Sequence, residues 1–140
     1  MFKRSFLLGI VSGLLAGIAS LVYANVYRSS LGVEFTKVAA VASIVAASVL
    51  GGVLAAIGYW LADKFLKNKA EIVFNLVFVI LTFASLLGPL GVRLPLDIEA
   101  PELFPGFAIP MHFFPALAWF TLKPLFIPSE IRHFEKPSKG

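Results

Sequence analysis

His112 is the one ionisable side chain that lies well inside an apolar run of this 140-residue chain. It follows Met111 in a run that extends from Phe107 to about Phe126. An ionisable residue at membrane depth is by default a candidate functional residue, because placing it there is costly. Imidazole chemistry at such a site includes metal or haem ligation and acid–base catalysis.

Two prolines leave backbone carbonyls without their usual helical donors near this depth. Pro115 has no N–H, so the carbonyl of Met111 loses its partner four residues along the helix. Pro89 has the same effect on the carbonyl of Ser85, near the end of another apolar run. Free carbonyls of this kind are acceptors that a polar side chain or a ligand could use.

The same residues are expected to lie at one depth. Ser85 and His112 each lie about five residues from the same end of their runs, or roughly 8 Å of helix rise. Asn25 lies near that end of the first run. We therefore predict a polar cluster of Asn25, Ser85, Pro89, Met111 and His112. In the alternative interpretation, His112 bonds a free carbonyl and only stabilises a kinked helix.

Several other chemistries are excluded or disfavoured by composition. Cysteine is absent, which excludes disulfides and thiolate metal sites. A bis-histidine haem needs a second histidine at membrane depth, whereas His133 lies in the tail, and a zinc site needs three or four ligands. Asp97, Glu99 and Glu102 form an acidic loop that could bind a cation weakly or orient the histidine, but a solvated loop is the commoner case. We expect no cofactor, no metal and no nucleic-acid partner.

The elements that position these residues are four apolar runs. Hydrophobic residues make up 59% of the chain and charged residues 14%, against about 45–50% and 25% in soluble domains. Each run is long enough to cross a hydrocarbon core about 30 Å thick, and short links favour antiparallel neighbours. The sequence predicts one all-α domain over residues 1–140, a four-helix antiparallel transmembrane bundle with a cytoplasmic tail at 129–140. The predicted spans are about 6–27, 38–62, 72–90 and 107–126.

The basic residues predict the orientation. Three lie at one end of the predicted bundle, namely Arg28, Lys37 and Arg93. The others lie at the opposite end: Lys3, Arg4, Lys64, Lys67, Lys69, Lys123, Arg132, Lys136 and Lys139. Because basic residues are retained on the cytoplasmic side, we expect a multi-pass protein of a bacterial inner membrane with both termini in the cytoplasm. A carboxylate inside the membrane, which proton-coupled transporters usually keep, is absent from the runs.

The first run has an alternative interpretation as a cleavable signal peptide. Met1 to Ala24 has a basic start and ends in the small-residue pattern Val22-Tyr23-Ala24. However, its apolar stretch is longer than the roughly 7–15 residues of a signal core. We therefore expect the first run to be kept as a spanning helix.

Aromatic and basic side chains near the ends of the runs predict where the membrane interfaces lie. Tyr23 and Tyr27 suit the outer belt, and Tyr59 and Trp60 the inner one. Lys123, near the end of the fourth run, is expected to extend its ammonium group to the inner surface.

Small residues recur at every fourth position in the first two runs. Gly9, Gly13 and Gly17 form a double G-x-x-x-G pattern, which lets another backbone approach closely. The second run carries two neighbouring stripes: Ser43, Ala47, Gly51 and Ala55, and then Ser48, Gly52 and Ala56. We predict tight packing of the first two helices within one chain, with an oligomer interface as the alternative.

The motifs Ser85-Leu86-Leu87-Gly88-Pro89 and Met111-His112 carry a family resemblance. With the small-residue first hairpin, they resemble an uncharacterised group of small bacterial four-helix integral membrane proteins of unknown function, over most of residues 5–127. The resemblance implies this topology and draws attention to Ser85, Pro89 and His112. It implies no activity.

Three classes of function remain. The absence of a catalytic set and the small-residue stripes favour a non-catalytic accessory or interaction subunit of a larger inner-membrane assembly. One alternative is a small oligomeric transporter or channel, for which only Asn75, Thr82, Ser85 and His112 could line a path. The other is a membrane enzyme or a lipid- or quinone-binding protein, which requires the cluster at His112 to open into a pocket.

Overall fold

The computed structural model describes residues 1–128, and all of its regular elements over that range are helical. This confirms the all-α prediction, whereas the predicted tail at 129–140 lies outside the described residues. The elements in chain order are α1 (Phe2–Leu31), α2 (Val41–Leu66), the 3-10 helix η1 (Lys67–Lys69), α3 (Ala70–Ser85), α4 (Leu87–Gly91), the 3-10 helix η2 (Pro101–Leu103) and α5 (Phe104–Phe126).

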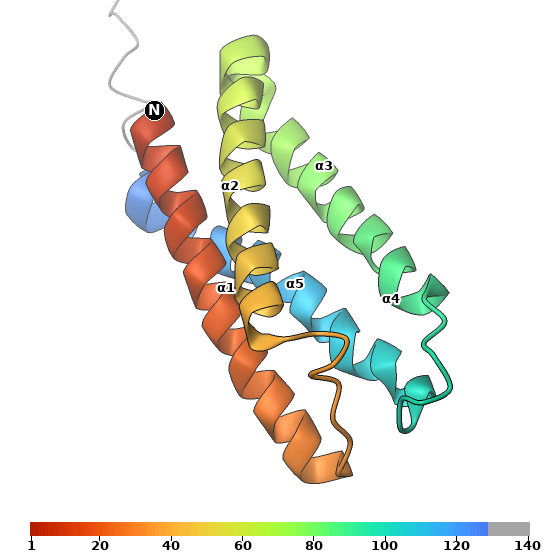
Figure 1. The fold of residues 1–140 in the computed structure, drawn as a ribbon. Helices are drawn as coiled ribbons and strands as arrows, with labels where there is room; N and C mark the ends of the chain where they lie inside the picture. Colours follow the sequence, from red (N-terminus) through yellow and green to blue (C-terminus); the bar gives the residue numbers. More distant parts are fainter. Residues whose placement is uncertain (129–140) are drawn as a thin grey trace, which may run out of the picture.

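The helices form an elongated arrangement with two distinct ends (Figure 1). α1 and α2 run antiparallel along each other, and α5 crosses behind them. α3 leaves α2 at η1 and diverges from it toward α4. We call the end that holds the N-terminus and η1 the N-terminal end. The opposite end, which holds the connections at residues 32–40 and 92–100, is called the loop end.

Local chemistry explains where the helices begin and end. Gly32 adopts a left-handed conformation with φ 70°, and its N–H donates to the carbonyl of Arg28 at 2.8 Å, which closes α1. The second run becomes helical only at Val41, because the N–H of Ala39 turns back to the carbonyl of Phe35 at 2.7 Å. The third run is divided at Leu86 into α3 and α4, three residues before Pro89.

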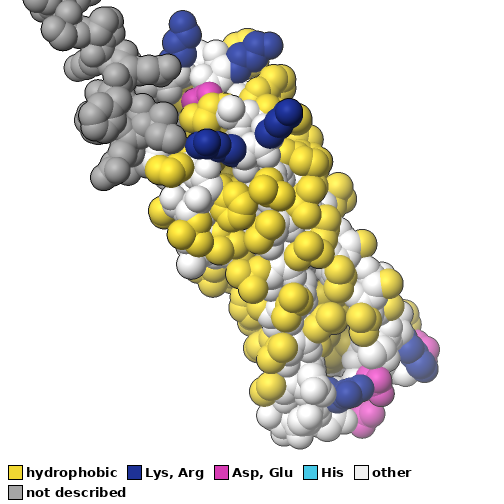
Figure 2. Space-filling model, turned by 90° about the vertical axis from the view of Figure 1, so that its left-hand side faces the viewer, with side chains coloured by type: hydrophobic (Ala, Val, Ile, Leu, Met, Phe, Trp, Pro, Cys, Tyr) yellow, Lys and Arg dark blue, Asp and Glu magenta, His cyan; other side chains and the backbone are white. Residues whose placement is uncertain are grey.

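Three helical ranges are long and apolar enough to cross a membrane: Phe2–Leu31, Val41–Gly91 and Pro101–Phe126. Figure 2 shows apolar side chains over the middle of one face, with charged side chains gathered at its two ends. Both observations are consistent with the predicted membrane protein.

An aromatic core joins the helices near the N-terminal end. Trp119 of α5 and Tyr59 of α2 are both 0% exposed. The ring of Phe74 from α3 lies 5.5 Å from that of Trp119 and 5.2 Å from that of Tyr59, in the geometry that aromatic pairs prefer. Leu8 of α1 belongs to the same cluster. The prediction that Tyr59 lies in the inner interfacial belt is wrong, because its ring is a central part of this core.

Lys123 also lies in this core instead of extending to the surface. Its Nζ is 2.9 Å from Oε1 of Glu71, in the first turn of α3, and 4.8 Å from the centre of the Tyr59 ring. The lysine side chain is 9% exposed, whereas the glutamate side chain is 47% exposed. The surface position predicted for Lys123 is therefore wrong: a carboxylate and an aromatic face keep the ammonium group between the helices.

This ion pair predicts unequal effects for its two partners. Glu71→Ala should lower the free energy of unfolding by about 1–3 kcal/mol, because it leaves a buried ammonium group without its carboxylate. Lys123→Met should cost less, since the half-exposed carboxylate stays hydrated. Thermal melts of the two single variants and the double variant would test this. Equal losses from both single variants would contradict it.

The contact between α1 and α2 is the most extensive between any two helices, as predicted for the first hairpin. A side chain added at Gly52 would meet the carbonyl oxygen of Gly9 and lie 3.1 Å from Cα of Gly13. A Cβ added at Gly13 would lie 2.7 Å from Cα of Val49. At these positions the two backbones approach so closely that only glycine fits.

Candidate functional site

A lateral groove lies between α2, α3–α4 and α5. It is lined by one face of the segment from Val38 to Ala62, one face of the segment from Val73 to Val92, and residues between Phe104 and Pro115. Its volume is about 850 Å³, within the range of about 300–1,000 Å³ that is typical of ligand pockets. The lining is predominantly apolar.

The groove runs the depth of a bilayer and is open along one side. On α2 alone its lining extends from Ser43 to Ala62, which is about 29 Å at 1.5 Å per residue. Leu54 and Leu81, on opposite walls, are each 59% exposed and form part of the rim. A long apolar molecule could therefore enter the groove from its exposed side.

The two small-residue stripes of α2 face different surroundings. Ser48, Gly52 and Ala56 are buried, and Gly52 packs against α1. Ala47 and Gly51 lie on the adjacent face and line the groove, and a Cβ added at Gly51 would have nothing within 4 Å. Ser48 also lines the groove, and Ala55, at the end of the Gly51 stripe, is buried in the aromatic core. The two stripes therefore differ chiefly at Ala47 and Gly51, which do not pack closely against α1.

The structure brings Ser85, Pro89, Met111 and His112 to the same groove. The rings of Phe83 and Phe113 are 5.5 Å apart and pair α3 with α5 at this level. Ser85 lies two residues beyond Phe83, and His112 one residue before Phe113, in helices of opposite direction. The two polar residues therefore lie at about the same depth, on the loop-end side of this ring pair.

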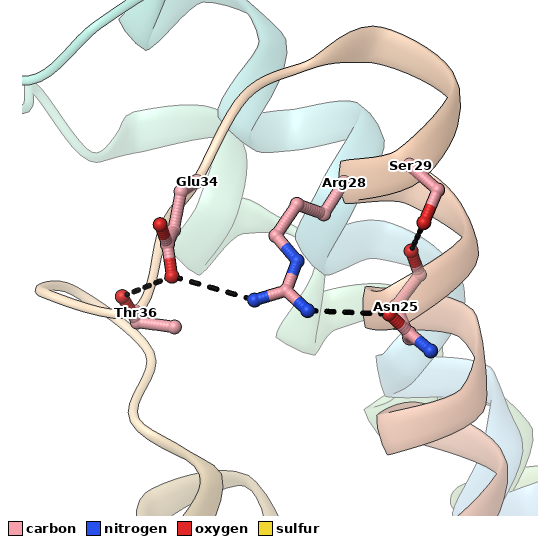
Figure 3. Close-up of polar contacts among 5 residues, drawn as sticks. All are labelled: Asn25, Arg28, Ser29, Glu34 and Thr36. Carbon is pink, nitrogen blue, oxygen red and sulfur yellow. Dashed lines mark hydrogen bonds and ion pairs between the residues drawn. The ribbon is translucent and has the colours of Figure 1, made fainter.

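Asn25 lies apart from these four residues. Its Oδ1 accepts a hydrogen bond from Nη2 of Arg28 at 3.3 Å, and its carbonyl accepts one from Ser29 (Figure 3). Arg28 is also 3.5 Å from Oε1 of Glu34, which accepts from the Thr36 hydroxyl. Asn25 therefore belongs to an exposed polar network at the loop end, beside a second, smaller cavity that does not include His112.

The polar groups of the groove are bonded to their own helices. His112 Nδ1 is 2.9 Å from the carbonyl oxygen of Ala108, four residues earlier. The hydroxyl of Ser85 donates to the carbonyl of Thr82 at 2.6 Å, and that of Thr82 donates to Phe78 at 2.8 Å. The imidazole thus bonds Ala108 and not the Met111 carbonyl that Pro115 leaves free.

Two tyrosines hold the start of α5 in place, a role that the sequence analysis missed. Pro110 leaves the carbonyl of Gly106 without its helical donor, and Tyr23 Oη donates to that carbonyl at 2.8 Å. Tyr27 Oη donates to the carbonyl of Leu103 at 2.8 Å. The free carbonyl follows from the position of Pro110, but its partner comes from α1 and could be found only from the fold.

The remaining polar residues of the described chain do not add a ligand-binding group to the groove. The buried Oδ1 of Asn75 has no partner among the described residues, and Asn75 does not line the groove. Within residues 1–128, no group of three or more His, Asp and Glu side chains is placed to hold a metal ion. The groove therefore offers an apolar surface and a few hydrogen-bonding groups.

No family model, no curated protein and no solved structure matches this chain. The resemblance carried by Ser85–Pro89 and Met111-His112 therefore stays a prediction, and the functional argument rests on the groove itself.

Proposed function

We propose that this protein binds the apolar tail of a membrane amphiphile, a lipid or an isoprenoid compound, in the lateral groove. The observation that carries the proposal is a groove of about 850 Å³ that extends along the full apolar length of α2. The proposal is supported by Ser85, Pro89, Met111 and His112, four of the five residues of the predicted cluster, which line this groove.

The exposed rim supports entry of a ligand from the bilayer instead of from water. Lipid tails and the groove walls are equally apolar, so transfer of a tail between them gains little from the hydrophobic effect. Retention depends instead on close packing along the walls and on the few hydrogen bonds available. Small residues on α2 and bulky ones on α3 give the groove its shape.

Filling the groove should displace the amphiphile. Ala47→Leu adds a branched side chain to the lining, whereas Ala46→Leu makes the same change on an exposed position outside it. In native mass spectrometry of protein extracted in a mild detergent, we expect about one retained amphiphile per chain. The retained fraction should fall about tenfold in Ala47→Leu, as for a loss of about 1.4 kcal/mol.

The Ala46→Leu variant is the matched control and should retain the wild-type fraction. Equal losses from both variants, or no retained molecule in the unaltered protein, would contradict the proposal.

An accessory role in a larger inner-membrane assembly is the second candidate. It is favoured by the exposed Ser43 and Ala47 and the half-buried Gly51 on α2, since small residues at this spacing allow a partner helix to approach closely. The mass of the gently purified particle separates the two. A stoichiometric larger partner favours the accessory role, and a chain that carries only an amphiphile favours the first proposal.

We further propose that the chain crosses the membrane four times. The range Val41–Gly91 contains both α2 and α3–α4, and the chain reverses between them at η1, where Lys67 has φ 45°. Lys3, Arg4, Lys64 and Lys69 lie at the N-terminal end of the molecule, which supports a cytoplasmic location for that end.

Reporter fusions test this topology. Alkaline phosphatase fused after Gly140 should be inactive, and the same enzyme inserted at Gly32 should be active, because it folds only outside the cytoplasm. The reverse pattern would contradict the proposed orientation. Activity at both sites would contradict the number of spans.

A further inference from the structure

The hydrogen-bond directions inside the groove select the kind of headgroup that it can bind. Ser48, Thr82 and Ser85 each donate their single hydroxyl hydrogen to a carbonyl of their own helix, at 2.8, 2.8 and 2.6 Å. Each hydroxyl oxygen keeps lone pairs after donating. These three side chains therefore offer acceptors to a ligand, and no donors.

The imidazole of His112 follows the same pattern. A carbonyl oxygen can only accept, so the bond to Ala108 requires the proton to be on Nδ1. In the neutral ring Nε2 then carries the lone pair, and it is the only ring atom left to bond a ligand in the groove. Ser43, the other polar residue of the lining, is exposed on the face of α2 near the loop end.

A charged donor does not fit this lining. Within residues 1–128 no aspartate or glutamate lines the groove, so an ammonium group would be desolvated without a counter-charge. His112 lies eight residues into α5, about 12 Å from its start by helix rise. At that depth a phosphate headgroup would also lose its hydration. A small neutral donor remains, and among membrane amphiphiles this is a hydroxyl group.

From these contacts we infer that the groove recognises a long-chain alcohol whose hydroxyl group donates to Nε2 of His112. The inference rests on the proposed function, because the tail must occupy the apolar length of the groove. Ser85 lines the groove at the same depth, but the single hydrogen of the ligand hydroxyl group is assigned to the imidazole nitrogen, the stronger acceptor of the two. Isoprenoid alcohols and the hydroxyl groups of quinols share this chemistry.

The test compares two probes that differ only at the hydroxyl group, where a methyl group replaces the hydrogen in one of them. Farnesol and its methyl ether have the same tail, but only the alcohol donates a hydrogen bond. Saturation binding of each radiolabelled probe to the full chain in phosphatidylcholine nanodiscs should give a dissociation constant about threefold to tenfold lower for the alcohol, the value of one neutral hydrogen bond. This comparison needs no variant.

Two variants then assign the acceptor. His112→Phe keeps a ring of similar size without the acceptor, so both probes should bind with the affinity of the ether. Asn75→Leu removes a buried polar group of α3 that does not line the groove, and it should leave the preference for the alcohol intact. Loss of the preference in Asn75→Leu, or its survival in His112→Phe, would overturn the assignment to His112.

The two proposals fail in different ways. Equal saturable binding of alcohol and ether to the unaltered chain would reject recognition of a hydroxyl group and leave the tail-binding groove standing. If neither probe binds saturably, the proposed function itself fails.

Discussion

Gly52→Ala should be strongly destabilising, although it adds a single methyl group. That methyl group would meet the carbonyl oxygen of Gly9 and approach Cα of Gly13 to 3.1 Å. The obstructing atoms belong to the backbone of α1, so no side chain can rotate away and the two helices must separate. Overpacking of this kind costs about 1–3 kcal/mol, and we expect a loss near the upper value. Equilibrium unfolding in mixed detergent micelles measures it.

Gly51→Ala is the matched control for this substitution. It makes the same change one residue earlier, where an added Cβ has nothing within 4 Å. Because alanine has the better helix propensity, the unfolding free energy should stay constant or rise slightly. If Gly51→Ala and Gly52→Ala behave alike, close backbone contact does not hold α1 against α2.

Trp119→Ala is the second substitution with a large expected effect. The indole is 0% exposed and its ring centre lies 6.0, 5.5 and 6.1 Å from those of Tyr59, Phe74 and Phe78. Removing it opens a cavity among α2, α3 and α5 and deletes the dispersion contacts that replace the hydrophobic effect in lipid. Large-to-small changes of this type cost about 3–5 kcal/mol in soluble cores, and we expect about 3 kcal/mol here.

Two controls separate packing from general damage to α5. Trp119→Phe keeps most ring contacts and removes an indole N–H that is buried without a partner in the described part of the chain. It should therefore be much milder than Trp119→Ala. Leu117→Ala changes a residue that is 58% exposed on the same helix and should leave the melting temperature nearly unchanged. A loss as large as that of Trp119→Ala in Leu117→Ala would contradict this description of the core.

The spacing of residues along the chain predicted those features that depend only on neighbouring residues. Apolar runs gave the helices, and the glycines at every fourth position identified the face of α1 that contacts α2. Equal distances from the helix ends placed Ser85 and His112 at one depth, and the Phe83–Phe113 pair agrees with that placement. Each of these inferences uses helix rise and periodicity alone.

Other features depend on the angles between helices, which periodicity does not determine. The divergence of α3 from α2 opens the groove and separates the stripe of Gly51 from that of Gly52. The crossing of α5 behind α1 brings the hydroxyl of Tyr23 to the carbonyl that Pro110 leaves free. It also buries Lys123 against Glu71, 52 positions away in the chain. Asn25 did not join His112 because its face of α1 is exposed at the loop end, beside the second cavity and outside the groove.

The unequal lengths of the helices have a consequence for the lipids around the molecule. α1 has 30 residues and α3 has 16, or about 45 Å and 24 Å of helix. A bilayer core is about 30 Å thick, so in the proposed four-span topology α3 alone is too short, whereas α3 and α4 together, residues 70–91, reach about 33 Å. α1 is longer than this core, and such hydrophobic mismatch is relieved by tilting of the helix or by local thickening of the bilayer. In that topology we expect the thickest lipid shell beside α1 and a thinner one beside α3, along the side on which the groove opens.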